Sequence, residues 1–422
     1  MPLREYQQKA VDRIFAYWEK SKQPCIMQLA TGAGKSWICA EIVNKLENES
    51  VLILQPSKEI LEQNYEKLLA TGFDPRKVSI CSASAGSWKI NRFVTFATIG
   101  TIAKHWDKCQ HISTVIIDEV DCVPVDRADS QYMKFLNHLP ASTKVMGLTA
   151  TPWRNVVFTS RFADPKIYCR PLTRINCRDG QGTKMGQWVF KNVIYRMGIK
   201  ELQDMGFLSK TKYYVTETDW SFVNDVPGRM DFDTNEMMRW TEIEDNTSRF
   251  TQAIKWCMDY KLKAIVFTPN IDMNFRLQNV IHALGGTAEC MDSDNDTKRS
   301  REQKMQEFHD GKFQFLVNVG MVGRGVDVPS VDAVILCRPT KSLSLYMQYV
   351  GRCLRVDPDN PDKLAYILDL SGNVERFGHV ENIKLIPVQA TTDSGWQHTK
   401  ETIVLRPGDS DDNPPKVFDR VS

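Results

Sequence analysis

The sequence predicts an α/β protein of two tandem lobes, each built on a parallel sheet. The chain has 422 residues, and domains of about 150 residues are usual, so two or three domains are expected. Short apolar runs rich in β-branched residues alternate with stretches of helical period, which is typical of parallel α/β architecture. This alternation fades between Trp153 and about Phe250 and then restarts, which indicates a second lobe.

The expected elements follow from these apolar runs and from the helical periodicity between them. Strands of the first lobe are expected at Cys25–Leu29, Val51–Gln55, Val78–Cys81, Phe93–Ala97, Val115–Asp118 and Val145–Thr149. Its helices are expected at Lys35–Leu46 and Lys58–Leu69. Strands of the second lobe are expected at Ala264–Thr268, Phe315–Val319, Ala333–Cys337 and Ala365–Leu368. Its helices are expected at Asp272–Leu284, Lys298–His309 and Ser344–Leu354.

The same pattern divides the chain into three parts. Residues 1–208 form the N-terminal lobe with a basic extension at 153–208. Residues 209–388 form the C-terminal lobe with its linker, in which turn formers at 225–228 break the periodicity. Residues 389–422 are a tail that we expect to be partly mobile, because 407–415 is rich in Pro and Asp.

Composition narrows the class of protein. Hydrophobic residues make up 42% and charged residues 25%, close to the average of globular domains, which excludes wholesale disorder and fibrous repeats. Apolar runs such as 51–54 fall far short of the roughly 18 residues that a membrane span needs, so no membrane partner is expected. The N-terminus is charged from Arg4 onward and the cysteines contain no C-x-x-C pair; both features favour an intracellular protein.

The net charge of +2 predicts no particular partner, but one stretch is strongly basic. Residues 153–212 contain twelve Lys and Arg against four Asp and Glu. A polyanion could bind there, although an ordinary solvated surface can have the same composition. Trp153, Trp188 and Phe190 lie in this stretch and are candidates either for stacking on unpaired bases or for core packing.

A glycine-rich loop follows the first expected strand. Residues 30–36 read Ala-Thr-Gly-Ala-Gly-Lys-Ser between a strand and a helix, the context that a phosphate-binding P-loop requires, although a glycine turn with a coincidental lysine is the alternative. Glycines at 32 and 34 allow backbone N–H groups to face a polyphosphate. Lys35 is expected at the β and γ phosphates and the Ser36 hydroxyl at Mg²⁺. The expected nucleotide-binding residues of the loop are Thr31, Gly32, Ala33, Gly34, Lys35 and Ser36.

Two carboxylates end a later strand. Val115 to Ile117 run directly into Asp118 and Glu119. After a P-loop, this position favours Asp118 as a ligand in the Mg²⁺ shell and Glu119 as the general base for a hydrolytic water. In isolation, a strand that ends in Asp-Glu is more often a solvated turn.

These motifs and others, in order along residues 3–373, resemble those of superfamily 2 helicases. Residues 3–7 resemble the adenine-reading Q motif, in which Arg4 and Gln7 are the implied nucleotide-binding residues and Gln7 matches the residue that reads the base edge. The other matching segments are 30–36 (motif I), 55–59 (Ia), 97–101 (Ib), 118–121 (II), 148–152 (III), 265–270 (IV), 323–327 (V) and 348–355 (VI).

The resemblance implies that each lobe has a RecA-like fold and that ATP binds in the cleft between the lobes. In motif V it implies nucleotide contacts by Gly325 and Asp327. In motif VI it implies catalytic roles for Gln348, Arg352 and Arg355, with the arginines reaching the γ-phosphate on closure of the cleft. The alternative is that the two arginines, three residues apart, lie on the solvated face of a helix.

Motifs Ia, Ib, IV and V are implied to hold a nucleic-acid backbone. The candidate residues are Pro56, Ser57, Thr98, Gly100, Asn270 and Arg324. Backbone contacts carry no sequence information and depend on salt. Motif II has Val120 where better-known members carry Ala or Cys, so we expect its coupling to motif III to differ in detail.

Within the superfamily, the opening residues 3–8 and the stretch 315–373 are most similar to RadD helicases and phage branch-migration helicases. That resemblance implies an ATP- and Mg²⁺-dependent DNA helicase or translocase that moves 3′ to 5′ on single-stranded and branched DNA, in repair, recombination or replication. It also implies the cytoplasm of a bacterium or phage-infected host, and single-strand-binding or recombination proteins as partners. Two alternatives stay open: an RNA helicase, and a clamp that binds ATP without hydrolysing it.

Overall fold

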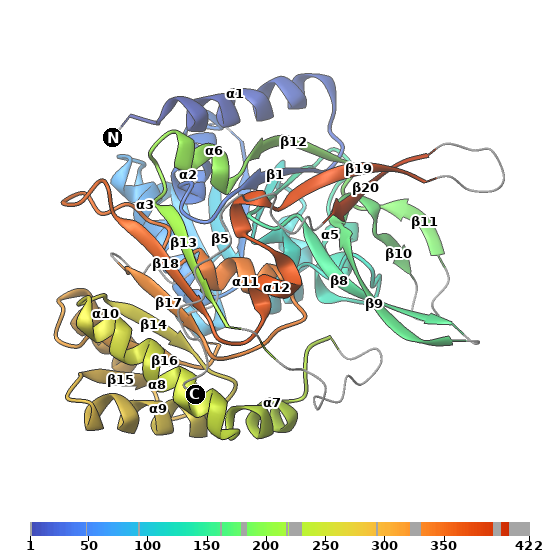
Figure 1. The fold of residues 1–422 in the computed structure, drawn as a ribbon. Coiled ribbons are helices and arrows are strands. Elements are labelled where there is room, and N and C mark those ends of the chain that lie inside the picture. The colour runs from blue at the N-terminus through green and yellow to red at the C-terminus, as the bar shows by residue number, and fades with distance from the viewer. Residues whose placement is uncertain are drawn as a thin grey trace. The chain divides into compact units, whose positions relative to one another are not determined.

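A computed structural model describes residues 2–404 except 48, 92, 161, 162, 179–183, 217, 219–229, 293, 321–330 and 391–397. It describes the backbone alone within 156–168, 176–188 and 384–404 and at 174, 244, 245 and 298. The chain forms two compact units, of which the first includes Met1–Arg154 and Arg170–Gly198 and the second includes Asn155–Cys169 and Ile199–Ile386. Each unit contains a parallel sheet with helices packed on it (Figure 1).

The first unit is built on an eight-stranded sheet in the order β12-β1-β7-β6-β2-β5-β3-β4. Its strands are β1 (Cys25–Leu29), β2 (Val51–Gln55), β3 (Val78–Ser82), β4 (Ser87–Trp88), β5 (Val94–Thr98), β6 (Thr114–Asp118), β7 (Lys144–Thr149) and β12 (Asn192–Met197). All neighbours are parallel apart from the pair of β3 and β4. Every residue of β2 and β6 is buried, as expected for parallel strands covered on both faces.

The helices of the first unit are α1 (Glu5–Lys20), α2 (Lys35–Lys45), α3 (Lys58–Ala70), α4 (Ile99–Ile102) and α5 (Gln131–His138). Of these, α1, α4 and α5 were not among the predicted helices. The buried side chains of α1 include Ala10, Ile14 and Trp18, whose spacing of four places them on one apolar face. The periodic signal for this helix was therefore present beside the Q motif.

The second unit has a six-stranded, fully parallel sheet in the order β13-β18-β17-β14-β16-β15. Its strands are β13 (Lys210–Val215), β14 (Ala264–Phe267), β15 (Ala288–Met291), β16 (Phe315–Asn318), β17 (Ala333–Leu336) and β18 (Leu364–Asp369). Its helices are α6 (Ile199–Asp204), α7 (Thr234–Thr241), α8 (Glu244–Asp259), α9 (Ile271–Ala283), α10 (Lys298–His309), α11 (Leu343–Val350) and α12 (Asn373–Phe377).

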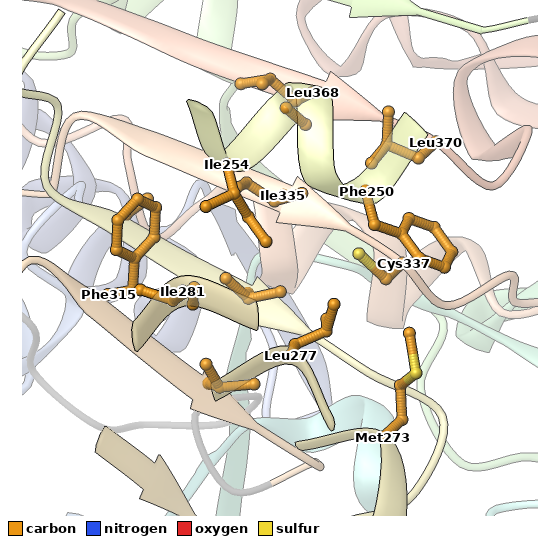
Figure 2. Packing of buried hydrophobic residues seen from close by; sticks show 14 of the residues in the cluster. Phe250, Ile254, Met273, Leu277, Ile281, Phe315, Ile335, Cys337, Leu368 and Leu370 are labelled. Atoms are coloured by element: carbon orange, nitrogen blue, oxygen red, sulfur yellow. The ribbon is translucent and has the colours of Figure 1, made fainter. Parts of the chain in front are cut away.

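A hydrophobic cluster fills the space between this sheet and helices α8 and α9 (Figure 2). The helices contribute Phe250, Ile254, Met273, Leu277 and Ile281 to it, and the strands contribute Phe315, Ile335 and Leu368. Each fully buried side chain of this size contributes about 1.5–3 kcal/mol through removal from water. The cluster fixes the sheet, and with it the loops at the ends of its strands.

The region from Trp153 to Phe250, in which the sequence predicts a basic extension and a linker, contains regular structure. β8 (Trp153–Ser160) pairs with β9 (Ala163–Pro171), and β10 (Asn176–Arg178) pairs with β11 (Lys184–Trp188). The side chains of Trp153 and Phe190 are 1% and 0% exposed. The stacking role is therefore wrong for these two residues, because their rings are packed in the interior. The side chain of Trp188 lies outside the described residues.

The C-terminal region contains a further two-stranded sheet of β19 (Lys384–Ala390) and β20 (His398–Val404). β20 lies within 389–422, the part that we expect to be a partly mobile tail, and residues 405–422 lie outside the described part of the chain. Among the described residues, no helix is both long enough and apolar enough to cross a membrane.

Candidate functional site

The glycine-rich loop lies between β1 and α2, where the sequence predicts it. Gly32 and Gly34 have φ angles of 85° and 79°, a left-handed conformation that glycine adopts without strain. A Cβ atom at residue 34 would lie 2.4 Å from Gln7 Nε2, so the close approach of α1 also requires glycine there. The first N–H groups of α2 have no acceptor within the helix, and together with the positive helix end they make this loop a site for phosphate oxygens.

Two residues of α1 hold this loop through one carbonyl oxygen. Tyr6 Oη donates to Ala33 O at 2.8 Å, and Gln7 Nε2 donates to the same oxygen at 3.1 Å. The side-chain oxygen of Gln7 accepts from Arg4 N at 2.9 Å. Both ends of the Gln7 amide are thus engaged within the chain, which gives Gln7 a role in the shape of the loop. Base reading by Arg4 and Gln7 stays a prediction.

Three of the predicted catalytic residues come together beside this loop. Lys35 Nζ lies 2.7 Å from Glu119 Oε1, and both side chains are 14% exposed. Asp118 is buried at the end of β6; its Oδ2 accepts from Asn64 Nδ2 at 2.9 Å and its Oδ1 accepts from Glu119 N at 3.0 Å. Asn64 was missed from the sequence. Its position could have indicated a role, because Asn64 is a polar residue among the buried apolar positions of α3.

The buried charged groups at this site shift one another's pKa values. Burial and, to a smaller extent, the Glu119 charge raise the pKa of Asp118 to about 6, against the opposing effect of the Lys35 charge. Burial by itself would lower the pKa of Lys35, but the carboxylates of Glu119 and Asp118 outweigh burial and raise it. Lys35 is therefore charged at neutral pH, as phosphate binding requires.

Motifs II and III are joined by packing and by a hydrogen bond. Glu119 has a φ of 47°, which is uncommon for a residue with a side chain. The next residue, Val120, fills the space above Gly147 in β7, where an added Cβ would lie 2.6 Å from Val120 Cγ1. Thr149 Oγ1, at the end of β7, donates to Asp121 Oδ1 at 2.7 Å. Gly147 is therefore the feature that accommodates the larger Val120, a partner that the sequence interpretation did not find.

The donor set here suits Mg²⁺. The Asp118 carboxylate and the Ser36 hydroxyl are hard oxygen ligands, the type that Mg²⁺ prefers. Among the described residues, no group of three or more His, Cys, Asp and Glu is placed to hold a metal ion. Such a sparse set fits an ion that is bound by one or two protein oxygens together with substrate phosphates.

In the second unit, helix α11 carries motif VI but ends before its arginines. The predicted helix ran to Leu354, whereas α11 ends at Val350 with Gly351 as its C-terminal cap. Arg352 follows in a turn and is 7% exposed, and Gln348 is 6% exposed. Arg355 forms an isolated antiparallel bridge with Leu208, and burial lowers its pKa. The alternative that both arginines lie on a solvated helix face is therefore wrong.

The predicted nucleic-acid residues have mostly local contacts. Ser57 Oγ accepts from Ile60 N at 3.4 Å and Asn270 Oδ1 accepts from Met273 N at 2.9 Å, so these side chains cap α3 and α9. Thr98 Oγ1 donates to Ser82 Oγ at 3.1 Å. Pro56 precedes the cap of α3 and Gly100 lies in α4; a backbone grip by these residues stays a prediction. Arg324, Gly325 and Asp327 lie outside the described residues.

Comparison with protein-family models gives two matches in the order of the two units. Residues 1–154 match the family described as type III restriction enzyme, res subunit. Residues 247–357 match the helicase conserved C-terminal domain. The first match contains the glycine-rich loop, Asp118 and Glu119, and the second contains Gln348, Arg352 and Arg355.

Individual proteins are similar over most of the chain. IRC3 of Saccharomyces cerevisiae is 26% identical over 392 residues, which cover 88% of this chain and 51% of that protein. DNA 3′-5′ translocase XPB2 of Sulfurisphaera tokodaii is 26% identical over 384 residues, covering 87% of this chain and 81% of that one. The chain thus spans about half the length of the yeast relative.

A solved structure has the same fold. The ATP-dependent Type ISP restriction-modification enzyme LlaBIII bound to DNA superposes with a TM-score of 0.58 at 17% identity, over 87% of this chain and 27% of that one. Both family models match in order, one within each unit, and each unit contains a parallel sheet; the chain is therefore similar over both units to the ATP-hydrolysing helicases of superfamily 2.

Proposed function

We propose that this chain is an ATP- and Mg²⁺-dependent DNA helicase or translocase that unwinds or branch-migrates forked and four-way-junction DNA, moving 3′ to 5′, in repair, recombination or replication. The observation that carries the proposal is the ion pair of Lys35 and Glu119, 2.7 Å apart beside a glycine-rich loop. The similarity to XPB2, a DNA 3′-5′ translocase, supports the DNA substrate and the direction of movement.

In the first unit, each residue has a defined task. The loop N–H groups and Lys35 bind the phosphates of ATP, and Lys35 must exchange Glu119 for phosphate oxygens as they arrive. That exchange releases the Glu119 carboxylate to accept a proton from the attacking water. Asp118 and Ser36 would hold Mg²⁺, which neutralises charge on the β and γ phosphates when bound.

In the second unit, Arg352 and Arg355 supply guanidinium groups that neutralise charge developing on the γ-phosphate. An arginine in this role contributes about 10³ to 10⁵ in rate. Gln348 lies in the last turn of α11, two positions before the helix end at Val350. Hydrolysis then depends on the arginines reaching the nucleotide, so ATP turnover is coupled to a change of conformation.

The grip on DNA runs through its backbone. Helices α3 and α4 begin directly after β2 and β5, next to Pro56, Ser57, Thr98 and Gly100, and helix N-termini bind phosphates readily. The affinity for single strands should then fall with salt, with a log–log slope of about 0.7 per phosphate contacted. A flat salt dependence would contradict a backbone grip.

The deciding experiment measures ATP hydrolysis with single-stranded DNA, duplex, forks, four-way junctions and RNA. We expect branched and single-stranded DNA to give the strongest stimulation, and Lys35→Ala and Glu119→Gln to abolish both hydrolysis and strand separation. Stronger stimulation by RNA would favour an RNA helicase. Strand separation that survives in both variants would favour a clamp that uses ATP only as a ligand.

A further inference from the structure

A buried lysine behind motif VI has no assigned role. Lys363 lies just before β18, outside every helicase motif, and is 5% exposed. Burial lowers its pKa, against the opposing effect of nearby groups that include Asp332 and Asp357. A lysine is rarely buried to this extent unless its ammonium group has strong partners.

Those partners are main-chain oxygens of the arginine segment. Lys363 Nζ donates to Cys353 O at 3.0 Å and to Arg355 O at 2.8 Å. Ser209, 2% exposed, completes the set: its N–H donates to Leu354 O at 2.7 Å and its hydroxyl donates to Arg355 O at 3.1 Å. Three consecutive carbonyls that follow the end of α11 are therefore bound by Lys363, 8 to 10 residues further along the chain, and by Ser209, 146 residues before Arg355.

We propose that Lys363 is a positioning residue for ATP hydrolysis, which holds the main chain of residues 353–355 so that Arg355 is presented in one orientation, with Ser209 as its helper. This inference rests on the proposed function, in which Arg355 is the catalytic group. After α11 ends at Val350, turn hydrogen bonds continue to Cys353 N, which donates to Val350 O at 3.2 Å. The carbonyls of Cys353 and Arg355 follow these turns, and Lys363 binds both with charge-assisted hydrogen bonds, which are stronger than neutral ones.

The variant Lys363→Met tests this role because it removes the hydrogen bonds of Lys363 and little else. Methionine has a similar length but no donor, so Cys353 O loses its Lys363 bond and Arg355 O keeps only the Ser209 hydroxyl. A displacement of about 1 Å at a catalytic group can cost about 100-fold in rate. We expect kcat for DNA-stimulated ATP hydrolysis to fall about 10- to 100-fold, with the Kd for ATP within about two-fold of wild type, because the phosphate loop belongs to the first unit and Lys363 to the second.

The test compares Lys363→Met, Arg355→Ala and the double variant, with thermal unfolding followed in parallel. If Lys363 acts through Arg355, the double variant hydrolyses ATP no more slowly than Arg355→Ala. Lys363→Arg, which keeps donors, should recover part of the rate. The matched control is Lys263→Met, since Lys263 Nζ also donates to a carbonyl, that of His309, elsewhere in this unit; it should leave kcat unchanged.

Two results would overturn the inference: a kcat for Lys363→Met equal to that of Lys263→Met, or a further loss of the same factor in the double variant. If Arg355→Ala keeps the wild-type kcat, the proposed role of Arg355 fails first, and the inference fails with it. If Lys363→Met does not fold, Ser209→Ala replaces it. That change removes one of the bonds to Arg355 O, and it should lower kcat a few-fold, again only while Arg355 is present.

Discussion

The two units hold their charged residues in different ways. In the first unit, side chains hold side chains: Lys35 pairs with Glu119, and Asn64 binds Asp118. In the second unit, Lys363 and Ser209 bind the main-chain carbonyls of the segment that carries Arg355. Changes in the first unit should therefore act through charge and loop shape, whereas changes in the second should act through the position of the backbone.

The largest effect should come from Arg355→Lys. Lysine keeps the charge but lacks the planar fork of donors, so we expect kcat to fall about 10³-fold or more while the Kd for ATP changes little. Steady-state hydrolysis and fluorescent-nucleotide titration measure the two quantities. Arg276→Lys is the control, because Arg276 is exposed and pairs with Glu242. A variant with more than a tenth of the wild-type kcat would show that charge alone suffices.

The next effect tests loop shape in the first unit. Gly34→Ala should cost about 1–2 kcal/mol for the left-handed conformation and about 1–3 kcal/mol more for the contact with Gln7, and ATP affinity should fall. Gly72→Ala is a matched control, since Gly72 has a φ of 90° and no atom within 4 Å of an added Cβ. Urea unfolding gives both free energies. Equal costs for the two variants would mean that the Gln7 contact is unimportant.

A third test addresses the packing between motifs II and III. Gly147→Ala should lower the free energy of unfolding by about 1–3 kcal/mol, because the new methyl group overlaps Val120. The double variant Val120→Ala with Gly147→Ala should recover most of that loss and of the ATPase rate. A double-mutant cycle measures the coupling. Additive losses would show that Val120 and Gly147 are not fitted to each other.

The smallest expected effect is on the way the free energy of unfolding depends on pH. The pKa of Asp118 is raised to about 6, above its value of about 3.9 in an unfolded chain, so the folded state binds the proton more tightly. Its contribution to stability is fully present below about pH 4 and is lost as pH rises to about 6, with a slope of at most about 1.4 kcal/mol per pH unit. Asp118→Asn should flatten this part of the curve of unfolding free energy against pH.

The same measurement of unfolding free energy against pH can be made on a buried carboxyl group of the second unit. Burial raises the pKa of Asp369 to about 6, so Asp369→Asn should flatten the same pH range. Unchanged slopes in both variants would mean that neither carboxyl group binds its proton more tightly in the folded state.

Much of the fold could be predicted from the sequence because parallel strands buried on both faces appear as apolar runs. The bounds of β1, β2 and α10 agree with the predicted ones. In the two large sheets, the edge strands β12, β4, β13 and β15 were missed. Edge strands often carry polar residues, and Asn192 and Lys210 are exposed at the starts of β12 and β13. The end of α11 was placed too late because Gly351 gives only a weak stop signal inside an otherwise helical pattern.

Some residues of the candidate site could likewise be predicted from the sequence, and others could not. Lys35, Asp118 and Glu119 follow from local sequence context, since the loop and strand end that carry them have their own signature. Lys363 and Ser209 have no such signature, because their partners are main-chain oxygens that any residue would supply. Only the folded chain shows that they bind residues 353–355.

One hydrogen bond at the edge of the first sheet connects nucleotide binding to the course of the chain. Ala30 N, at the start of the phosphate loop, donates to Met197 O at 3.0 Å, and Met197 is the last residue of β12. Gly198 alone then separates β12 from α6 of the second unit. A shift of the loop that moves Ala30 must therefore break this bond or pull on Met197 and, through it, on Gly198.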